Sequence, residues 1–162
     1  MFRPDLVDVW IFRIRPDAGV ELLLMRRSAG RILPGLWQGV SGSLEPGERV
    51  VAGALRELRE ETGIDADVIE ALFDLDQVNQ FHEPSVDAIV TAAIFAVRVR
   101  PGTAETLSHE HDTARWVSPA EALDLVVWPA YRVSIARIAG DLLDPERARW
   151  FELGLDGGRV VG

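Results

Sequence analysis

The chain contains no cysteine, which excludes disulfide bonds and thiolate-ligated zinc sites. A chain without cysteine suits a reducing compartment, so the sequence predicts a cytoplasmic protein. No run of 18 or more apolar residues occurs, and none is therefore expected to span a membrane. Residues Met1–Asp5 have no apolar stretch behind their charge, so no signal peptide is expected.

Acidic residues outnumber basic residues in this chain. The sequence has 17 Lys and Arg against 26 Asp and Glu, a net charge of −9. Broad nucleic-acid binding depends on basic surface, so this function class is disfavoured. A phosphorylated small molecule is still compatible, because a bound cation can reverse the local charge of an acidic site.

The length and composition predict one domain over residues 1–162. A chain of 162 residues that is 48% hydrophobic can bury a substantial core. No repeat, low-complexity segment or interdomain linker interrupts the sequence. The last part, residues 145–162, contains Gly157-Gly158 and is expected to be a loosely held tail.

Apolar periodicity and turn residues predict strands alternating with helices. A polar loop through Gln80, His82, Glu83 and Pro84 is expected between the two longer strands, and Ser118 is expected to cap the helix that follows it, with Glu121 completing a capping box. The predicted strands are Val7–Arg15, Val20–Arg27, Leu36–Ser41, Val68–Val78, Ala88–Arg100 and Thr113–Val117, and the predicted helices are Glu48–Thr62, one from Pro119, and Ala130–Leu143.

Three glutamates cluster on one face of the first predicted helix. Glu57, Glu60 and Glu61 stand at i, i+3 and i+4, where side chains are neighbours and like charges repel. A hard divalent cation such as Mg²⁺ would use these carboxylates as ligands. The alternative is a solvated acidic face neutralised by the nearby Arg49, Arg56 and Arg59.

The rest of the helix favours the first interpretation. A mostly apolar stripe on the same helix can seat it on a sheet. Gly42 and Gly47 bracket a turn before the helix, and Gly63 stands where a helix C-cap is expected. The members of the stripe are Val51, Ala54, Leu55, Leu58 and Thr62.

The segment Gly42–Ile64 reads Gly-x5-Glu-x7-Arg-Glu-Leu-x-Glu-Glu-x-Gly-Ile. It resembles the Nudix box and matches all nine defining positions over 23 residues. The resemblance implies an α/β/α sandwich with a mixed sheet and a loop-helix-loop. It also implies a Mg²⁺-dependent hydrolase, with Mn²⁺ as a possible substitute, that cleaves a nucleoside diphosphate linked to another group.

The same resemblance implies roles for individual residues. The metal site would be built from Gly42, Glu57, Glu60 and Glu61. Arg56 would orient a carboxylate, and Glu48 would support the site from the loop side. The general base stays open among Glu57, Glu61 and Glu110.

Arginine and aromatic residues outside the box are candidates for substrate binding. Arg26 and Arg27 end the second predicted strand, where their forked guanidinium groups could hold a phosphate, and Arg31 follows as a weaker candidate. The alternative for each is a charge in water. Trp37 and Gln38 stand just before the box, and Trp37 would either stack on a base or fill the core.

A further carboxylate that is a candidate for the metal site lies in Ser108–Asp112. Members of the resembled family often carry a Glu-His pair before a short strand with Trp, which makes Glu110 a candidate metal ligand or base. Glu105 is the competing carboxylate, and a solvated loop is the alternative for both. His109 and His111 could form a transition-metal pair, although histidine suits Zn or Cu better than an oxygen-rich site.

The substrate class is less sharply predicted. Trp37–Gly42, the Glu-His pair and Trp128–Tyr131 resemble the dihydroneopterin triphosphate and dinucleoside polyphosphate branches. A nucleoside or pterin triphosphate comes first, a dinucleoside polyphosphate second and an ADP-sugar third. The alternative function is a noncatalytic module that senses a nucleotide or sugar-nucleotide, since fold does not dictate function. The sequence is compatible with a monomer or a homodimer.

Overall fold

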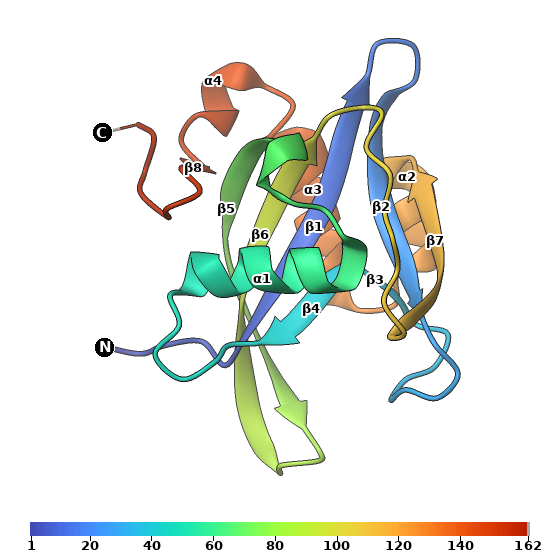
Figure 1. The fold of residues 1–162 in the computed structure, drawn as a ribbon, viewed down its shortest axis with the longest axis vertical. Coiled ribbons are helices and arrows are strands. Elements are labelled where there is room, and N and C mark those ends of the chain that lie inside the picture. The colour runs from blue at the N-terminus through green and yellow to red at the C-terminus, as the bar shows by residue number, and fades with distance from the viewer. Residues whose placement is uncertain (162) are drawn as a thin grey trace.

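The computed structural model describes residues 1–161 and shows a mixed sheet with helices on both faces (Figure 1). Gly162, the last residue of the expected domain, lies outside the described residues. The strands are β1 (Leu6–Arg15), β2 (Gly19–Arg27), β3 (Trp37–Gln38), β4 (Val40–Ser43), β5 (Ile69–Glu83), β6 (Ala88–Val99), β7 (His111–Val117) and β8 (Glu152–Leu153). The helices are α1 (Val50–Thr62), a short 3-10 turn at Ala66–Val68, α2 (Pro119–Leu125), α3 (Pro129–Gly140) and α4 (Pro145–Ala148).

The sheet is built around β1. Its strand order is β3-β2-β1-β6-β5-β8, with β4 pairing to β1 and β7 pairing to β2. β1 runs parallel to β6, whereas the other pairs are antiparallel. A central strand with parallel and antiparallel neighbours makes the sheet mixed, as predicted.

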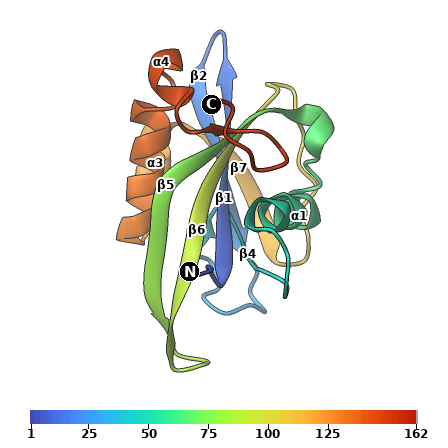
Figure 2. The same cartoon turned by 90° about the vertical axis from the view of Figure 1, so that its left-hand side faces the viewer.

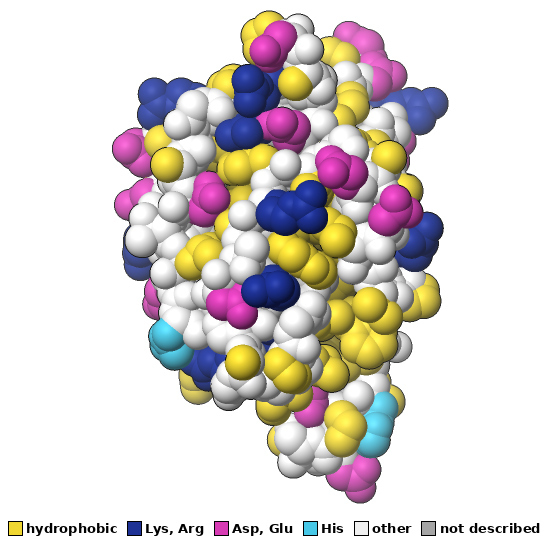
Figure 3. Space-filling model, turned by 90° about the vertical axis from the view of Figure 1, so that its right-hand side faces the viewer, with side chains coloured by type: hydrophobic (Ala, Val, Ile, Leu, Met, Phe, Trp, Pro, Cys, Tyr) yellow, Lys and Arg dark blue, Asp and Glu magenta, His cyan; other side chains and the backbone are white. Residues whose placement is uncertain are grey.

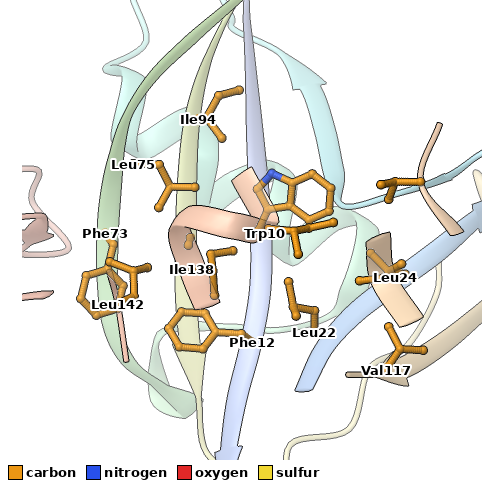
Figure 4. Close-up of a cluster of buried hydrophobic side chains, with 14 of the residues drawn as sticks. Trp10, Phe12, Leu22, Leu24, Phe73, Leu75, Ile94, Val117, Ile138 and Leu142 are labelled. Carbon is orange, nitrogen blue, oxygen red and sulfur yellow. The ribbon is translucent and has the colours of Figure 1, made fainter. Parts of the chain in front are cut away.

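Alternating side chains of β1 belong to two separate hydrophobic cores, one on each face of the sheet, because successive residues of a strand point to opposite faces. Trp10 and Phe12 join the core under α2 and α3, part of which is drawn in Figure 4. Val9 and Ile11 join the core under α1, together with Leu58 of that helix. Figure 2 shows α3 and α1 on opposite sides of the sheet. The predicted α/β/α sandwich is confirmed.

The hairpin of β5 and β6 is longer than the sequence predicts. β5 continues to Glu83, with His82 opposite Ile89 of β6, so the expected polar loop is mostly strand. Figure 1 shows this hairpin extending beyond the rest of the sheet. Because its side chains are exposed on both faces, the outer part of β5 lacks the alternation that marks a strand in a sequence.

The C-terminal part of the chain also differs from the expectation of a loose tail. β8 pairs with β5 through Leu153 opposite Leu72, and Leu153 is buried. The Arg159 guanidinium lies 2.9 Å from the Asp74 carboxylate. The predicted capping box at Ser118 is present, whereas α3 begins at Pro129 and ends at Gly140 instead of Leu143. No helix in residues 1–161 is long and apolar enough to cross a membrane.

Candidate active site on the acidic face of α1

Helix α1 is held on the sheet by an apolar face that adjoins Glu61, which is itself buried, and leaves Glu60 exposed. Ala54, Leu58 and Thr62 are buried there, as the predicted stripe requires. Gly63 ends the helix with a φ of 70°, and its N–H donates to the Arg59 carbonyl. This left-handed conformation is the one in which glycine carries no steric cost. The helix is therefore seated by its apolar face and ended by the predicted cap.

Gly42 of β4 lies against the Glu57 side chain. A Cβ atom at position 42 would stand 2.0 Å from Cδ of Glu57. Any side chain there would displace the carboxylate, so glycine is required for close approach. Gly42, the first residue of the box, therefore leaves room for the carboxylate of Glu57.

Arg56 is the centre of an ion-pair network beside this carboxylate. Its Nε and Nη2 donate to the two carboxylate oxygens of Glu48 at 2.8 and 3.0 Å. Its Nη1 donates to Glu57 at 2.7 Å and to Glu60 at 3.3 Å. The remaining Nη2 contact goes to the Ser43 carbonyl at 2.9 Å. The Arg56 contacts raise its own pKa and lower the pKa of Glu48 to about 2.

Glu61 stands apart from this network. Its side chain is only 5% exposed, and its Oε2 has no hydrogen-bond partner. Burial, followed by the charges of Glu110 and Glu57, raises the pKa of Glu61 to about 9. Burial is also the largest cause that raises the pKa of Glu57, to which the charges of Glu60 and Glu110 add. Without a cation, burial and the neighbouring carboxylates therefore favour the protonated, neutral form of Glu61 at neutral pH.

The donor set fits a hard divalent cation. Side chains that approach one another here carry carboxylate oxygens, the ligands that Mg²⁺ prefers. Within residues 1–161, no three acidic or histidine side chains already converge as a ready-made ligand set. The Arg56 contacts to Glu57 and Glu60 compete for the same oxygens. The unpaired, buried oxygen of Glu61 is the atom that most needs a cationic partner.

The three candidate arginines on and after β2 have different partners. Arg31 lies 3.7 Å from the Glu110 carboxylate. Arg26 pairs with Asp112 at 2.8 Å, whereas the Nε of Arg27 donates to the Ile32 carbonyl at 2.6 Å. Figure 3 shows basic, acidic and apolar side chains interspersed on the side of the molecule where β2 and β7 lie.

Trp37 and Gln38, the candidate substrate-binding residues before the box, lie in different environments. Trp37 is partly buried against the core under α3, with the guanidinium carbons of Arg26 and Arg115 at 6.0 and 5.9 Å from its ring centroid. Gln38 was expected to contact substrate, but it is 3% exposed and its Nε2 lies 3.2 Å from Nε2 of His111. Gln38 therefore faces the protein interior.

The family is decided by comparison with known proteins. Residues 4–138 match the model of the NUDIX domain. The chain belongs to the Nudix family. It is a Nudix hydrolase with pyrophosphohydrolase homologues, and hydrolases of this family are typically dependent on a divalent metal.

Two curated relatives share about a third of their aligned residues with this Nudix hydrolase. One is the CTP pyrophosphohydrolase of Escherichia coli K12, 35% identical over 111 residues that cover 68% of this chain and 76% of the relative. The other is an octanoyltransferase of Myxococcus xanthus, 35% identical over 124 residues. That match covers 75% of this chain but only 32% of the octanoyltransferase, so the chain spans about a third of that relative's length.

Solved structures show the same fold. An Ap4A hydrolase from Caenorhabditis elegans, in a binary complex, has a TM-score of 0.71 and 20% identity, with 87% of this chain and 98% of that chain covered. The E. coli dihydroneopterin triphosphate pyrophosphohydrolase has a TM-score of 0.65 and 24% identity, with coverage of 81% and 92%.

Three residues before or at the start of β7 have environments that sequence patterns do not reveal. Glu105, the competitor of Glu110, accepts a hydrogen bond from Nε1 of Trp116 at 3.1 Å. The charge of Glu110, in contrast, acts on both Glu57 and Glu61. The ring of His111 is buried, and burial lowers its pKa. Each partner comes from a strand or loop distant in sequence, so spacing carries no signal for it.

We expect the metal-free protein to lose stability as the pH rises. The pKa of Glu61 is raised from its ordinary value of 4.5 to about 9 in the folded state, so between these values the folded chain holds a proton that the unfolded chain has lost. The free energy of unfolding then falls with pH, by at most about 1.4 kcal/mol per unit for one group. Urea unfolding in chelator between pH 6.5 and 9 measures the slope. The Glu61→Gln variant should flatten it, and an equal slope in both proteins contradicts the assignment to Glu61.

Proposed function

We propose that this Nudix hydrolase is a Mg²⁺-dependent pyrophosphohydrolase, also active with Mn²⁺, that cleaves a diphosphate linkage in a nucleoside or pterin triphosphate or a related nucleoside diphosphate derivative. The observation that carries the proposal is the buried, unpaired carboxylate oxygen of Glu61 beside the charges of Glu57 and Glu110. An acidic pocket of this kind repels a polyphosphate by itself and attracts one when a divalent cation occupies it.

The proposed metal site consists of Glu57, Glu60 and Glu61 of α1, with Glu110 and the backbone of Gly42 at its edge. When bound, the cation supplies charge neutralisation of the diphosphate and activation of a water molecule. Arg56 holds Glu57 in place by a 2.7 Å contact and, with Glu48, fixes the position of the loop before the helix.

Hydrolysis adds water across one phosphoric anhydride bond. The water oxygen forms a bond to phosphorus while the bridging phosphorus–oxygen bond breaks, and the bridging oxygen keeps the electron pair. A nearby carboxylate accepts the water proton, and Glu57, Glu61 and Glu110 are the candidates for this role. We assign phosphate binding to Arg26, Arg27 and Arg31, since guanidinium groups bind two phosphate oxygens at once.

An apolar pocket beside the loop that carries Arg31 supports a substrate with a planar ring. Its volume is about 330 Å³, within the range of small-molecule sites. The loop that carries Arg31 contributes one wall, and the segment before α3 contributes the other, including Trp128, which is 41% exposed. The pocket is lined by Leu33, Pro34, Gly35, Leu36, Val127 and Trp128.

We expect Trp128→Ala to raise KM for a ring-bearing substrate by about tenfold, while kcat changes little. Stacking of a base on an aromatic ring contributes roughly 1–3 kcal/mol, and it is equally present before and during the reaction. Steady-state kinetics of the variant and of Trp128→Phe test this, since Phe keeps a stacking surface. A Trp128→Ala enzyme with unchanged KM would place the ring elsewhere.

The substrate class is tested by phosphate and pyrophosphate release with Mg²⁺ and with excess EDTA. The panel contains dihydroneopterin triphosphate, the nucleoside triphosphates including CTP, diadenosine polyphosphates and ADP-ribose. CTP and dihydroneopterin triphosphate are tested first, because two similar E. coli proteins are named for these substrates. Rapid, metal-dependent turnover of one substrate supports the proposal. Nucleotide binding without turnover across the whole panel contradicts it and favours a sensing module.

A further inference from the structure

Two buried polar atoms without hydrogen-bond partners face each other behind the acidic site. One is Oε2 of Glu61 on α1, and the other is Nδ1 of His111 at the start of β7. They lie 3.7 Å apart, with side-chain exposures of 5% and 0%. A buried polar atom without a partner destabilises the folded protein, so this pairing calls for an explanation.

The opposite side of the His111 ring determines its tautomer. Nε2 of His111 lies 3.2 Å from the amide nitrogen of Gln38, and both residues are buried. An amide nitrogen donates hydrogen bonds but has no lone pair that accepts one. With the Gln38 amide nitrogen on this side, Nε2 is the acceptor, and the proton of the neutral ring resides on Nδ1, which lies 3.7 Å from Oε2 of Glu61.

The fold holds the pair at a fixed distance from α1. Gln38 lies on β3 and His111 on β7, which both pair with β2 near its end. The register of β2 with β7 shifts between Arg26 and Arg27, immediately beside His111. The backbone N–H of Ser108 donates to the Glu61 carbonyl at 3.1 Å, which ties the loop before β7 to the end of α1.

We propose that Gln38 and His111 are a positioning pair that orients the Glu61 carboxylate toward a divalent cation. Gln38 locks the His111 tautomer, and the Nδ1–H group holds Oε2 so that the other oxygen of Glu61 faces the site. A shift of about 0.7 Å brings the two atoms to hydrogen-bonding distance. The inference rests on the proposed function, because it takes Glu61 as a metal ligand.

Loss of a hydrogen-bonding partner behind a ligand typically reduces metal affinity or activity by about 10–100-fold. His111→Gln and His111→Asn form a matched pair, since both remove the ring and keep a neutral amide. The Asn amide nitrogen can occupy the position of Nδ1 and still donate to Glu61, whereas the longer Gln side chain places its amide near the position of Nε2. Gln38→Met removes the hydrogen bond that fixes the His111 tautomer and keeps the side-chain volume nearly constant.

The first measurement is the tautomer itself, in the metal-free full-length protein. Long-range ¹H–¹⁵N correlation spectra distinguish protonation at Nδ1 from protonation at Nε2, and comparison with His111→Asn assigns the signals. We expect Nδ1 to carry the proton in the wild-type protein and the two tautomers to mix in Gln38→Met. A wild-type ring protonated at Nε2 would overturn the proposal.

The second measurement is binding of Mn²⁺ alone, from the electron paramagnetic resonance signal of the free ion. We expect an affinity about 10–100-fold lower for His111→Gln and Gln38→Met, and within a few-fold of wild type for His111→Asn. Melting temperatures measured alongside separate folding defects from the metal effect. Equal losses for the Asn and Gln variants at equal stability would overturn the positioning role.

Glu61→Gln separates this inference from the proposed function. If this variant binds Mn²⁺ as tightly as wild type, Glu61 is no ligand and the proposed site fails. If it loses Mn²⁺ affinity while Gln38→Met and His111→Gln retain theirs, the site stands and only the positioning pair is rejected. In active protein, the positioning role also predicts a lower kcat with an unchanged KM for His111→Gln.

Discussion

Glu61→Gln is expected to reduce metal-dependent turnover by about 10²–10³-fold, which corresponds to several kcal/mol in the activation barrier. The substitution keeps the shape of the side chain and removes the charge that would bind the cation. The folded state should not suffer, because Glu61 is buried with an unpaired Oε2 and a pKa raised to about 9. The metal-free fold already keeps this carboxyl protonated and neutral at neutral pH, so a neutral amide of the same shape replaces it at little cost.

The measurement is kcat on the preferred substrate together with the melting temperature in chelator. Glu105→Gln is the matched control, since its carboxylate accepts from Trp116 and a glutamine oxygen can accept the same bond. The control should keep near wild-type turnover. The Glu61→Gln variant should melt at the same temperature as the metal-free parent or higher. Full activity of Glu61→Gln would exclude this residue from the site.

The sequence predicted the parts of the site that depend on local spacing. One helical face carries Glu57, Glu60 and Glu61, and the periodicity of the apolar stripe shows which face is free. The left-handed C-cap at Gly63 was also expected, since a glycine follows the last acidic turn. These features follow from helix geometry alone. The mixed sheet and both helical layers followed from the resemblance.

Contacts between distant segments were not predictable in the same way. The interior position of Gln38 depends on the register of β3 against β2, and its partner His111 depends on a register shift between β2 and β7. Neither register is visible in a single sequence when polar residues occupy the positions concerned. The sequence predicts a loop from Gln80, where the structure has the end of β5, for a related reason, because both faces of the strand are solvent-exposed there.

The Arg56 network explains why a positively charged side chain lies among the glutamates of α1. Arg56 reaches both oxygens of Glu48, together with Glu57 and the Ser43 carbonyl. Its contacts link the loop before α1 to the helix and hold Glu57 beside Gly42. Lysine has a single ammonium group that cannot span these acceptors, although it keeps the charge.

We therefore expect Arg56→Lys to lower both the free energy of unfolding and kcat, and Arg56→Gln to lower both further. Loss of hydrogen bonds to charged groups costs about 1–3 kcal/mol, at the lower end where water reaches the network. The rate should fall by about 10–100-fold, because the orientation of a ligand carboxylate is lost. Arg59→Gln, an exposed position on the same helix, is the matched control.

Urea unfolding with and without Mg²⁺ distinguishes charge compensation from simple packing. A bound cation neutralises the carboxylates that Arg56 otherwise compensates, so Mg²⁺ should stabilise Arg56→Gln more than it stabilises the parent, provided that the variant still binds the ion. If the two Arg56 variants unfold like Arg59→Gln and keep their rates, the network has no role in stability or positioning. If they lose stability equally with and without Mg²⁺, Arg56 acts as a structural tie between the loop and the helix, and its charge is not what the site requires.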